Sequence, residues 1–245
     1  VKPDGTSFSK LHNFLGSTNG ANPRGDLISD GTYLYGMTTW GGTLNSGVIF
    51  KIKPDGTGYT KILDFAGANG KYPTGSLILV GSFLYGMTSN GGTNNTGVTF
   101  KIKPDGTGYT KLLDFDPSTG TNTIGNSPLG SLISDGTFLY GMTEMGGVNG
   151  FGVVFKIKTD GSGYTKLFDF TNSNGSNPQS SLIIVGTYLY GMTTYGGTDN
   201  YGVIFKIKMD GTGFVKMFDF GTSSSLIGSS PYGSLLSNGT FLYGM

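Results

Sequence analysis

The phrase Leu34-Tyr35-Gly36-Met37 decides the fold, because the chain contains it five times. It returns at residues 84–87, 139–142, 189–192 and 242–245, at intervals of about 50 residues. Self-similarity at such a period is typical of repeat proteins, in which each repeat forms one supersecondary unit. We therefore predict a tandem-repeat architecture for the whole chain.

Each repeat has the pattern of four short strands. In the first repeat these are residues 26–29, 32–38, 47–53 and 59–65, separated by turns rich in Gly, Asp and Pro. The second strand carries apolar side chains on both faces, which predicts a sheet packed on both sides. Nowhere in the sequence do apolar residues follow the i, i+3, i+4 spacing of a helix. The chain is therefore predicted to be all-β.

Four-stranded antiparallel units repeated around an axis form a β-propeller, which leaves only short, protected edges. A β-solenoid is the alternative, but its repeats are usually shorter and rise as parallel coils. In the propeller, the apolar strand residues are buried between neighbouring blades. We expect this core to contain Leu34, Tyr35, Met37, Val48, Phe50, Ile52 and their counterparts in the other repeats.

The chain begins and ends inside a repeat. Val1 stands where Ile52 stands one repeat later, so residues 8–14 supply a fourth strand and residues 234–245 a first and second strand. We predict one domain over residues 1–245, a five-bladed β-propeller whose fifth blade is shared between the two chain ends. The third strand of that blade is absent. We expect the native protein to continue beyond Met245 with it; the alternatives are a strand from another chain or an inward shift of residues 8–14.

The strand order resembles that of kelch-type propellers, but the sequence motifs are closer to those of another family. It combines Leu-Tyr-Gly-Met-Thr (34–38), Gly-Gly (41–42), Gly-Val-Ile-Phe-Lys-Ile (47–52) and Asp-Gly-Thr-Gly-Tyr-Thr-Lys-Leu-Leu-Asp-Phe (105–115). These phrases resemble the bacterial choice-of-anchor tandem-repeat family known as the GloVer repeat, over essentially the whole chain. The resemblance implies a secreted or surface-anchored bacterial protein and supplies no catalytic residues.

Composition excludes several classes of partner. Only 13% of the 245 residues are charged and the formal net charge is +1, so we expect no nucleic-acid partner. No apolar run approaches the roughly 18 residues of a membrane helix, so no membrane insertion is expected. The chain has no cysteine, which excludes disulfides and thiol chemistry and fits an extracellular protein.

The inventory of reactive groups predicts no catalytic residues, no metal site and no cofactor. His12, the only histidine, occupies a position that is apolar in the other repeats, so we interpret it as a packing residue. Glu144, the only glutamate, is interpreted as a solvated loop charge. The Asp-Gly turns offer one carboxylate each, too few for calcium, and no helix follows the Gly-Gly pairs to complete a phosphate site. The recurring Lys and Asp of the third and fourth strands predict a cross-strand ladder at the blade rim.

The connections between strands differ in how much they vary. Turns after the first and third strands are nearly identical in every repeat. The connection from the fourth strand to the next repeat changes length, from 12 positions between Phe65 and Leu77 to 17 between Phe115 and Leu132. The loops after the second strand change chemistry, and aromatic and amide side chains there suit a carbohydrate or protein contact. The candidate ligand-binding residues are Trp40, Asn90, Phe151, Tyr195 and Tyr201; unconstrained drift of these loops is the alternative.

From these features we expect an extracellular or bacterial cell-surface module without enzymatic activity. It would present its variable loop face to a glycan or a protein, as a binding or adhesion module. The alternative is a structural spacer or assembly subunit of a larger surface protein.

Overall fold

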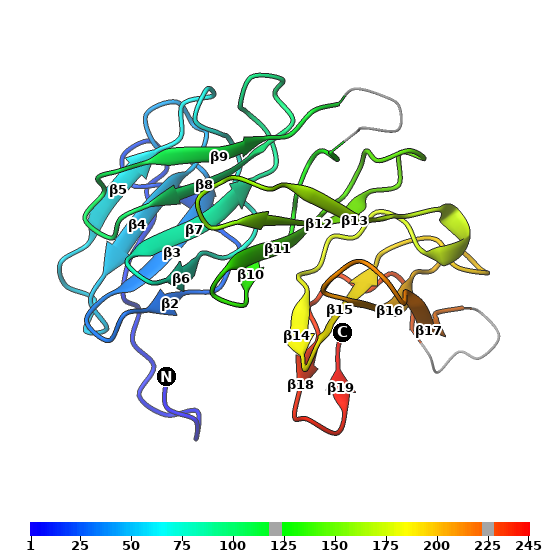
Figure 1. Cartoon of the computed structure of the whole chain (residues 1–245). Helices are drawn as coiled ribbons and strands as arrows, with labels where there is room; N and C mark the ends of the chain where they lie inside the picture. The colour runs from blue at the N-terminus through cyan, green and yellow to red at the C-terminus, as the bar shows by residue number, and fades with distance from the viewer. Residues whose placement is uncertain (118–123, 222–227) are drawn as a thin grey trace.

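The computed structural model describes residues 1–117, 124–221 and 228–245. Over these residues the chain forms antiparallel β-sheets and one 3-10 turn, η1 (Asn172–Asn174), as Figure 1 shows. The all-β prediction is confirmed. In this part of the chain we find no helix with the length and apolar character needed to cross a membrane.

Four sheets repeat one strand order. The first contains β2 (Ile28–Ser29), β3 (Leu34–Trp40), β4 (Val48–Ile52) and β5 (Thr60–Asp64), with β1 (Ala21–Pro23) also paired to β3. The second contains β6 (Ile78–Val80), β7 (Phe83–Thr88), β8 (Val98–Ile102) and β9 (Thr110–Asp114). The third contains β10 (Ile133–Ser134), β11 (Phe138–Thr143), β12 (Val153–Lys158) and β13 (Thr165–Asp169). The fourth contains β14 (Ile183–Val185), β15 (Tyr188–Thr193), β16 (Val203–Lys208) and β17 (Val215–Asp219).

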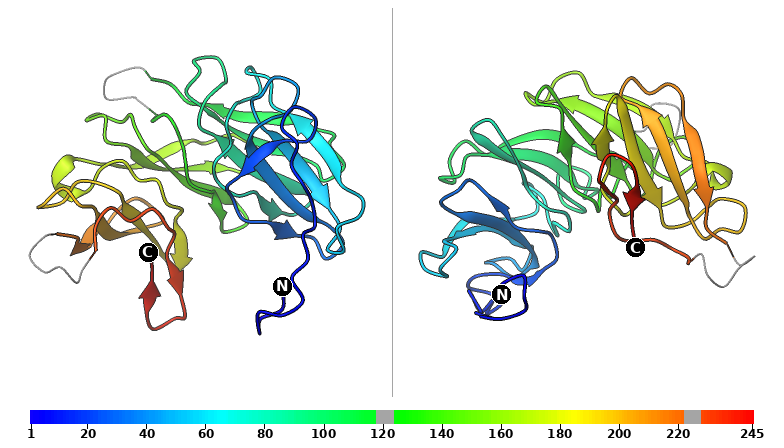
Figure 2. Two further views of the ribbon diagram at one scale, coloured as in Figure 1. Left: turned by 180° about the vertical axis from the view of Figure 1, so that it is seen from behind. Right: turned by 90° about the horizontal axis from the view of Figure 1, so that it is seen from below.

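The fifth sheet has only two strands, β18 (Leu236–Ser237) and β19 (Leu242–Tyr243). The sheets follow one another as a fan, with first strands such as β6 and β10 toward the inside and fourth strands such as β9 and β17 toward the outside (Figures 1 and 2). The arrangement is propeller-like. The fan stays open between the chain ends, so the predicted closed ring of five blades is not found.

One glycine in each complete sheet makes room for an aromatic ring. Gly36 lies opposite Phe50 in the register of β3 and β4, and Gly86 lies opposite Phe100 in the second sheet. A Cβ added to either glycine would lie 2.7 Å from the tip of that ring. The Gly of the repeated Leu-Tyr-Gly-Met phrase therefore reflects packing of the ring over the strand, since glycine alone leaves that space free.

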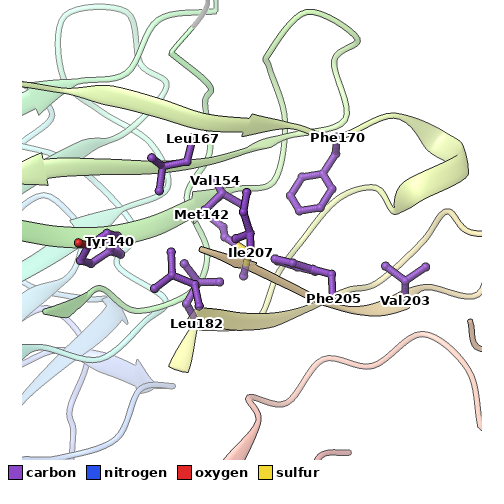
Figure 3. Close-up of a cluster of buried hydrophobic side chains, with 10 residues drawn as sticks. Tyr140, Met142, Val154, Leu167, Phe170, Leu182, Val203, Phe205 and Ile207 are labelled. Atoms are coloured by element: carbon purple, nitrogen blue, oxygen red, sulfur yellow. The ribbon is translucent and has the colours of Figure 1, made fainter. Parts of the chain in front are cut away.

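The apolar core lies between neighbouring sheets, as predicted. In the third and fourth sheets, Met142, Val154 and Phe170 meet Leu189 and Phe205 in one buried cluster (Figure 3). The residues of the first repeat that were predicted to form the core are buried, except Leu34, which is only partly buried. Leu34 faces away from the second sheet, toward the N-terminal segment, where only Leu11, Phe14 and Tyr59 complete its cluster.

The N-terminal residues 8–14 do not form a strand, and they do not pair with residues 234–245. The prediction of a composite fifth blade is therefore not confirmed. Phe14 nevertheless packs on Phe50 with ring centroids 5.1 Å apart, and His12 stacks on Tyr59 at 3.9 Å. The segment therefore packs against the first sheet at the position where a fourth strand of a preceding unit would pack. Without a neighbouring third strand it has no backbone ladder to join, so side-chain packing alone positions it.

The connections after the second and the fourth strands gather on one face, which we call the loop face. Tyr72 N–H donates to Ser46 O at 2.9 Å, and Gly92 N–H donates to Gly67 O at 2.8 Å, each joining the two kinds of connection. This confirms the predicted placement of the variable loops together. The two longest connections, 116–131 and 221–234, include residues outside those described. The nearly identical turns, such as 54–58, form the opposite turn face.

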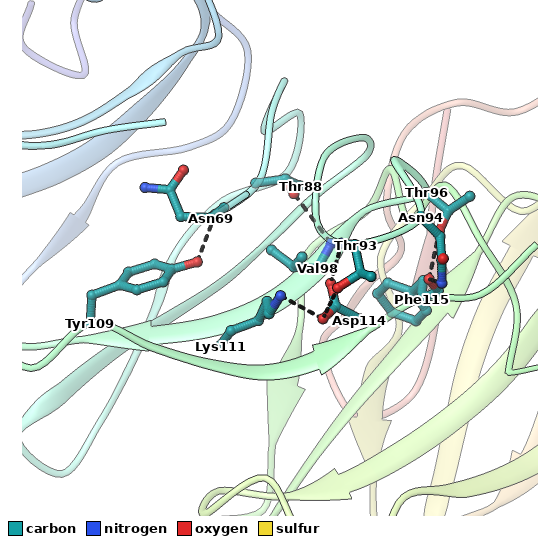
Figure 4. A network of polar contacts seen from close by, with 10 residues as sticks. All are labelled: Asn69, Thr88, Thr93, Asn94, Thr96, Val98, Tyr109, Lys111, Asp114 and Phe115. Carbon is teal, nitrogen blue, oxygen red and sulfur yellow. Dashed lines mark hydrogen bonds and ion pairs between the residues drawn. The ribbon is translucent and has the colours of Figure 1, made fainter. Parts of the chain in front are cut away.

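Lysine and aspartate side chains are arranged differently from the predicted cross-strand ladder. Lys111 pairs with Asp114 of the same strand at 2.5 Å, because Asp114 turns toward the Gly-Gly loop and accepts the backbone N–H of Thr93 (Figure 4). The lysines of the third strands connect neighbouring units instead. Lys51 Nζ lies over the Tyr33 ring and donates to Pro104 O in the next turn at 3.3 Å.

Candidate functional site: an axial cavity on the loop face

All five repeats meet at one small cavity. It has a volume of about 180 Å³ and lies where each first strand begins, at the loop face. Serine hydroxyls join the repeats beneath it: Ser131 Oγ accepts the N–H of Ser76, and Ser181 Oγ accepts the N–H of Ser131. A Cβ on Gly75 would lie 2.4 Å from Gly130 O, so glycine is required where the neighbouring backbones approach. We call this space the axial cavity.

All five repeats have a proline at the same position, and the residue directly after it lines the axial cavity. This residue is different in each of the five repeats. The strands of the repeats are nearly identical in sequence, so a position that differs in all five repeats and lines one shared cavity is a candidate for recognition. The set offers a guanidinium, a hydroxyl, an aliphatic group, an amide and a phenol. Its members, the axial residues, are Arg24, Thr74, Leu129, Gln179 and Tyr232.

A carboxylate stands beside two of the axial residues. Thr39 and Thr194 are buried and donate their hydroxyls to proline carbonyls of the next connection. Glu144 occupies the equivalent position in the third unit and instead accepts a 2.8 Å hydrogen bond from Gln179 Nε2. Burial raises the pKa of Glu144, although the bond from Gln179 opposes this. Among the described residues Glu144 has no salt-bridge partner.

Two phenols complete this polar cluster. The side chains of Tyr232 and Tyr195 are hydrogen-bonded, and this bond, together with the charge of Glu144, raises the pKa of Tyr232. Both rings are substantially exposed. A half-buried carboxylate without a cation, next to an amide and two accessible phenols, is an arrangement that accepts hydrogen bonds from a bound molecule.

A second feature of the loop face is an aromatic pair. The rings of Trp40 and Tyr72 lie with centroids 4.4 Å apart and planes tilted by 44°. Tyr72 has φ of 56°, in the left-handed region that bulky residues rarely adopt. The equivalent residues Asn22 and Asn177 share this conformation, which Asn tolerates more easily. The repeat therefore imposes this backbone geometry. Tyr72 adopts it despite the conformational strain, and its ring packs on Trp40.

The sequence-predicted residues fall into two groups on the loop face. Trp40, Asn90 and Tyr195 are equivalent, and each pairs through its backbone with the connection that leads into its own sheet. Asn90 uses its side chain within the loop, beside Ser89 and Asn95. Tyr195 is the one predicted residue that reaches the axial cluster.

Phe151 and Tyr201 form the second group, two positions before the third strands β12 and β16. Their carbonyls accept N–H groups of Asn177 and Ser230. Phe151 packs against the core between the third and fourth sheets, which argues against a ligand contact there. The candidate site thus retains Trp40 and Tyr195 of the predicted set and adds Tyr72, Glu144 and the axial residues.

Glu144 is not the solvated loop charge that the sequence predicted, because Gln179 and the third unit half-bury it. Two other interpretations are confirmed. His12 is a packing residue, with Nε2 2.8 Å from the Asn19 amide. Asp55 stabilises its turn by accepting hydrogen bonds from Thr57 N and Oγ1. The axial residues were missed, although comparing each position across the five repeats would have found them.

The fold and the axial cavity define a β-propeller-like tandem-repeat protein with a loop-face site. The chain belongs to the Gloeobacter/Verrucomicrobia repeat family, whose model matches residues 1–128 and again residues 121–245. The comparison with curated proteins gave no match. The comparisons do not confirm the kelch-type assignment.

Two solved structures support the propeller-like fold. A chain of a nidogen–laminin complex is similar with a TM-score of 0.58 and 16% identity, covering 91% of this chain and 71% of that one. A putative TolB from Agrobacterium tumefaciens is similar with a TM-score of 0.51 and 15% identity, covering 78% of this chain and 63% of that one. At these identities the likeness concerns the fold alone.

Proposed function

We propose that the chain is a non-enzymatic carbohydrate-binding module of the bacterial surface or the extracellular space, with the axial cavity holding a sugar residue. The observation that carries this proposal is the axial position itself. Five repeats whose strands agree closely in sequence place five different side chains around one cavity, which favours recognition over packing.

The chemistry of the cluster suits a polyhydroxylated ligand. Sugar hydroxyls both donate and accept, so they pair with a carboxylate acceptor such as Glu144 and with amide or guanidinium donors such as Gln179 and Arg24. A cavity of about 180 Å³ is smaller than the pockets of drug-sized ligands, so it takes one small group of a longer chain.

The Trp40–Tyr72 pair supplies the apolar contact that a sugar ring also needs. Aromatic faces pack against the C–H face of a sugar, and partly exposed rings on a rigid sheet lose little conformational freedom on binding. The left-handed backbone that Tyr72 shares with its equivalents directs its ring onto Trp40.

Existing contacts favour a binding role over catalysis. The His12 ring is stacked on Tyr59 and bonded by Asn19, and the Glu144 carboxylate is bonded by Gln179. Localisation outside the cell is supported by the lack of cysteine and by the resemblance noted above.

A glycan array probed with the labelled chain tests the proposal. We expect binding to a restricted set of glycans, followed by measurement of affinity for the best one by calorimetry. Arg24→Ala and Gln179→Ala should each weaken that affinity by about tenfold or more, since each removes a charged or amide hydrogen bond.

The matched control is Lys103→Ala, which also removes one exposed positive charge but lies on the turn face. It should leave affinity unchanged. Equal losses in Arg24→Ala and Lys103→Ala would indicate non-specific charge attraction. Absence of binding to any glycan of the array would favour the alternative, a structural spacer or assembly subunit.

A further inference from the structure

The third unit replaces a buried hydroxyl by a carboxylate on the loop face. At the equivalent position the first, second and fourth units have Thr39, Ser89 and Thr194, which are buried and donate their hydroxyls to backbone carbonyls. Glu144 takes this position in the third unit and is only half-buried. An ionised carboxylate accepts hydrogen bonds and donates none, so it cannot make the contact of the other units. The substitution therefore needs a different partner.

The backbone of Glu144 is fixed on both sides. Its N–H donates to Ser127 O at 3.1 Å, and its carbonyl accepts the side-chain amide of Asn177 at 3.4 Å. Asn177 is itself held in place, because its N–H donates to Phe151 O at 3.0 Å. The carboxylate is therefore attached to a rigid part of the third and fourth units, which limits the conformational freedom that it loses when a ligand binds.

The cluster around this carboxylate is rich in hydrogen-bond acceptors. Gln179 Nε2 donates to Glu144 Oε1 at 2.8 Å. The second oxygen of Glu144 and the side-chain carbonyl of Gln179 accept no hydrogen bond from the described part of the chain. Tyr195 pairs through its backbone with Ser176, on the connection that leads to Gln179, and adds a phenol to a side chain that is 39% exposed. A group that donates several hydrogen bonds suits this cluster.

The charge of Glu144 has no counter-ion within the described residues. Neither Glu144 nor Arg24, the guanidinium of the axial cavity, forms an ion pair there. Burial raises the pKa of Glu144, because the charged form loses hydration, although the bond from Gln179 opposes this. A cation brought by a ligand would offset the cost of the buried charge.

We propose that Glu144, Gln179 and Tyr195 form a subsite for the ammonium group of an amino sugar whose amine is free. The subsite rests on the carbohydrate-binding function proposed above and defines the class of sugar that it takes. The ammonium donates to Glu144 and to the Gln179 carbonyl, and the Tyr195 ring favours the nearby positive charge. The hydroxyls next to the amine reach the polar axial cavity, which Gln179 also lines. An N-acetyl group lacks the charge and most of the donors, so this subsite discriminates free from acetylated amines.

Acetylation of the ligand tests the ammonium contact directly. The best-bound glycan of the array is measured by calorimetry before and after treatment with acetic anhydride, which acetylates its free amines. We expect acetylation to lower the affinity at least about tenfold, because a charged hydrogen bond is lost. Of the free sugars glucosamine and galactosamine, at least one should displace the untreated glycan, and its N-acetyl form should not.

Two variants separate the charge of Glu144 from its role in the fold. Glu144→Gln keeps an acceptor for Gln179, and Glu144→Thr restores the residue type of the first and fourth units. Both should lower the affinity for the free-amine glycan at least about tenfold and leave that for the acetylated glycan unchanged. Asp199→Asn, which removes an exposed loop carboxylate, should alter neither affinity. Arg24→Ala should weaken both by a similar factor, since it contacts another part of the sugar.

Three results would overturn the proposal: a best-bound glycan without a free amine, equal affinity of the free and acetylated forms, or equal competition by the amino sugar and by Nα-acetyl-lysine amide. The last would show attraction of any primary amine instead of recognition of a sugar. In all three cases glycan binding persists, so the function proposed above is unaffected. Absence of binding to any glycan of the array would instead remove that function and the ammonium subsite with it.

Discussion

The side-chain amide of Gln179 donates a 2.8 Å hydrogen bond to the carboxylate of Glu144, which precedes it by 35 residues. Equivalent positions use a hydroxyl–carbonyl bond, as Thr39 does with Pro73 O. Glu144 therefore introduces a charge where the repeat has a neutral group. Burial raises the pKa of this carboxyl, and the Gln179 bond offsets only part of the effect. Ionised Glu144 thus lowers the stability of the fold.

Replacing Glu144 by glutamine should stabilise the protein at neutral pH. Because its pKa in the folded chain lies above the unfolded value of 4.5, ionisation favours unfolding as pH rises through the folded pKa. Glu144→Gln should therefore raise the free energy of unfolding at about pH 7 by up to about 1 kcal/mol, allowing for partial exposure. The gain should vanish at about pH 3, where the wild-type group is protonated.

Urea unfolding at the two pH values measures this gain. Asp199→Asn, at an exposed loop carboxylate, is the control and should change stability little. A loss of stability in Glu144→Gln at neutral pH would mean that the charged Glu144–Gln179 bond outweighs the cost of burial.

Truncating a third-strand phenylalanine should strongly destabilise the interface between two sheets. Phe100 is fully buried and contacts both Phe65 of the preceding sheet and Tyr109 of its own. Phe100→Ala should lower the free energy of unfolding by about 3–5 kcal/mol, through lost transfer free energy and a residual cavity. Phe241→Ala, at a side chain that is 64% exposed, should cost less than about 0.5 kcal/mol. Similar losses in the two variants would contradict the buried interface.

The Lys111–Asp114 pair should contribute less than the other bonds of Asp114 (Figure 4). The pair is about a quarter to a third exposed, so a double-mutant cycle should give a coupling below about 1 kcal/mol. Asp114→Ala should cost more than Lys111→Ala, because it also leaves the N–H of Thr93 without its acceptor. A larger loss in Lys111→Ala would reverse this order of importance.

The same aspartate should make stability fall in acid. Burial tends to raise the pKa of Asp114, but the bonds from Lys111 and Thr93 outweigh it and the pKa is lowered below 3.8. Its contribution is therefore present above about pH 3.8 and is lost as pH falls through the folded pKa. The stability difference between wild type and Asp114→Asn, followed by urea unfolding, should shrink in that range.

Local pattern was sufficient to predict the sheets, because strand period and turn residues act within one repeat. Phe50 and Gly36 illustrate this, since their register follows from the hairpin that joins their strands. The site was less predictable. Glu144 and Gln179 are in contact only because two units pack side by side. Neither residue lies in a local sequence pattern that predicts this contact. The composite fifth blade is not confirmed, because residues 8–14 have no third strand to pair with and form no strand of their own.

A pair of equivalent glycines tests the packing of the phenylalanine ring over the second strand. Gly86→Ala places a Cβ 2.7 Å from the Phe100 ring and should cost about 1–3 kcal/mol by overpacking. Gly244→Ala meets only flexible side-chain ends and should change stability by less than about 0.5 kcal/mol. Urea unfolding of both variants measures the difference. Equal costs for the two glycines would mean that the space above Gly244 is already filled.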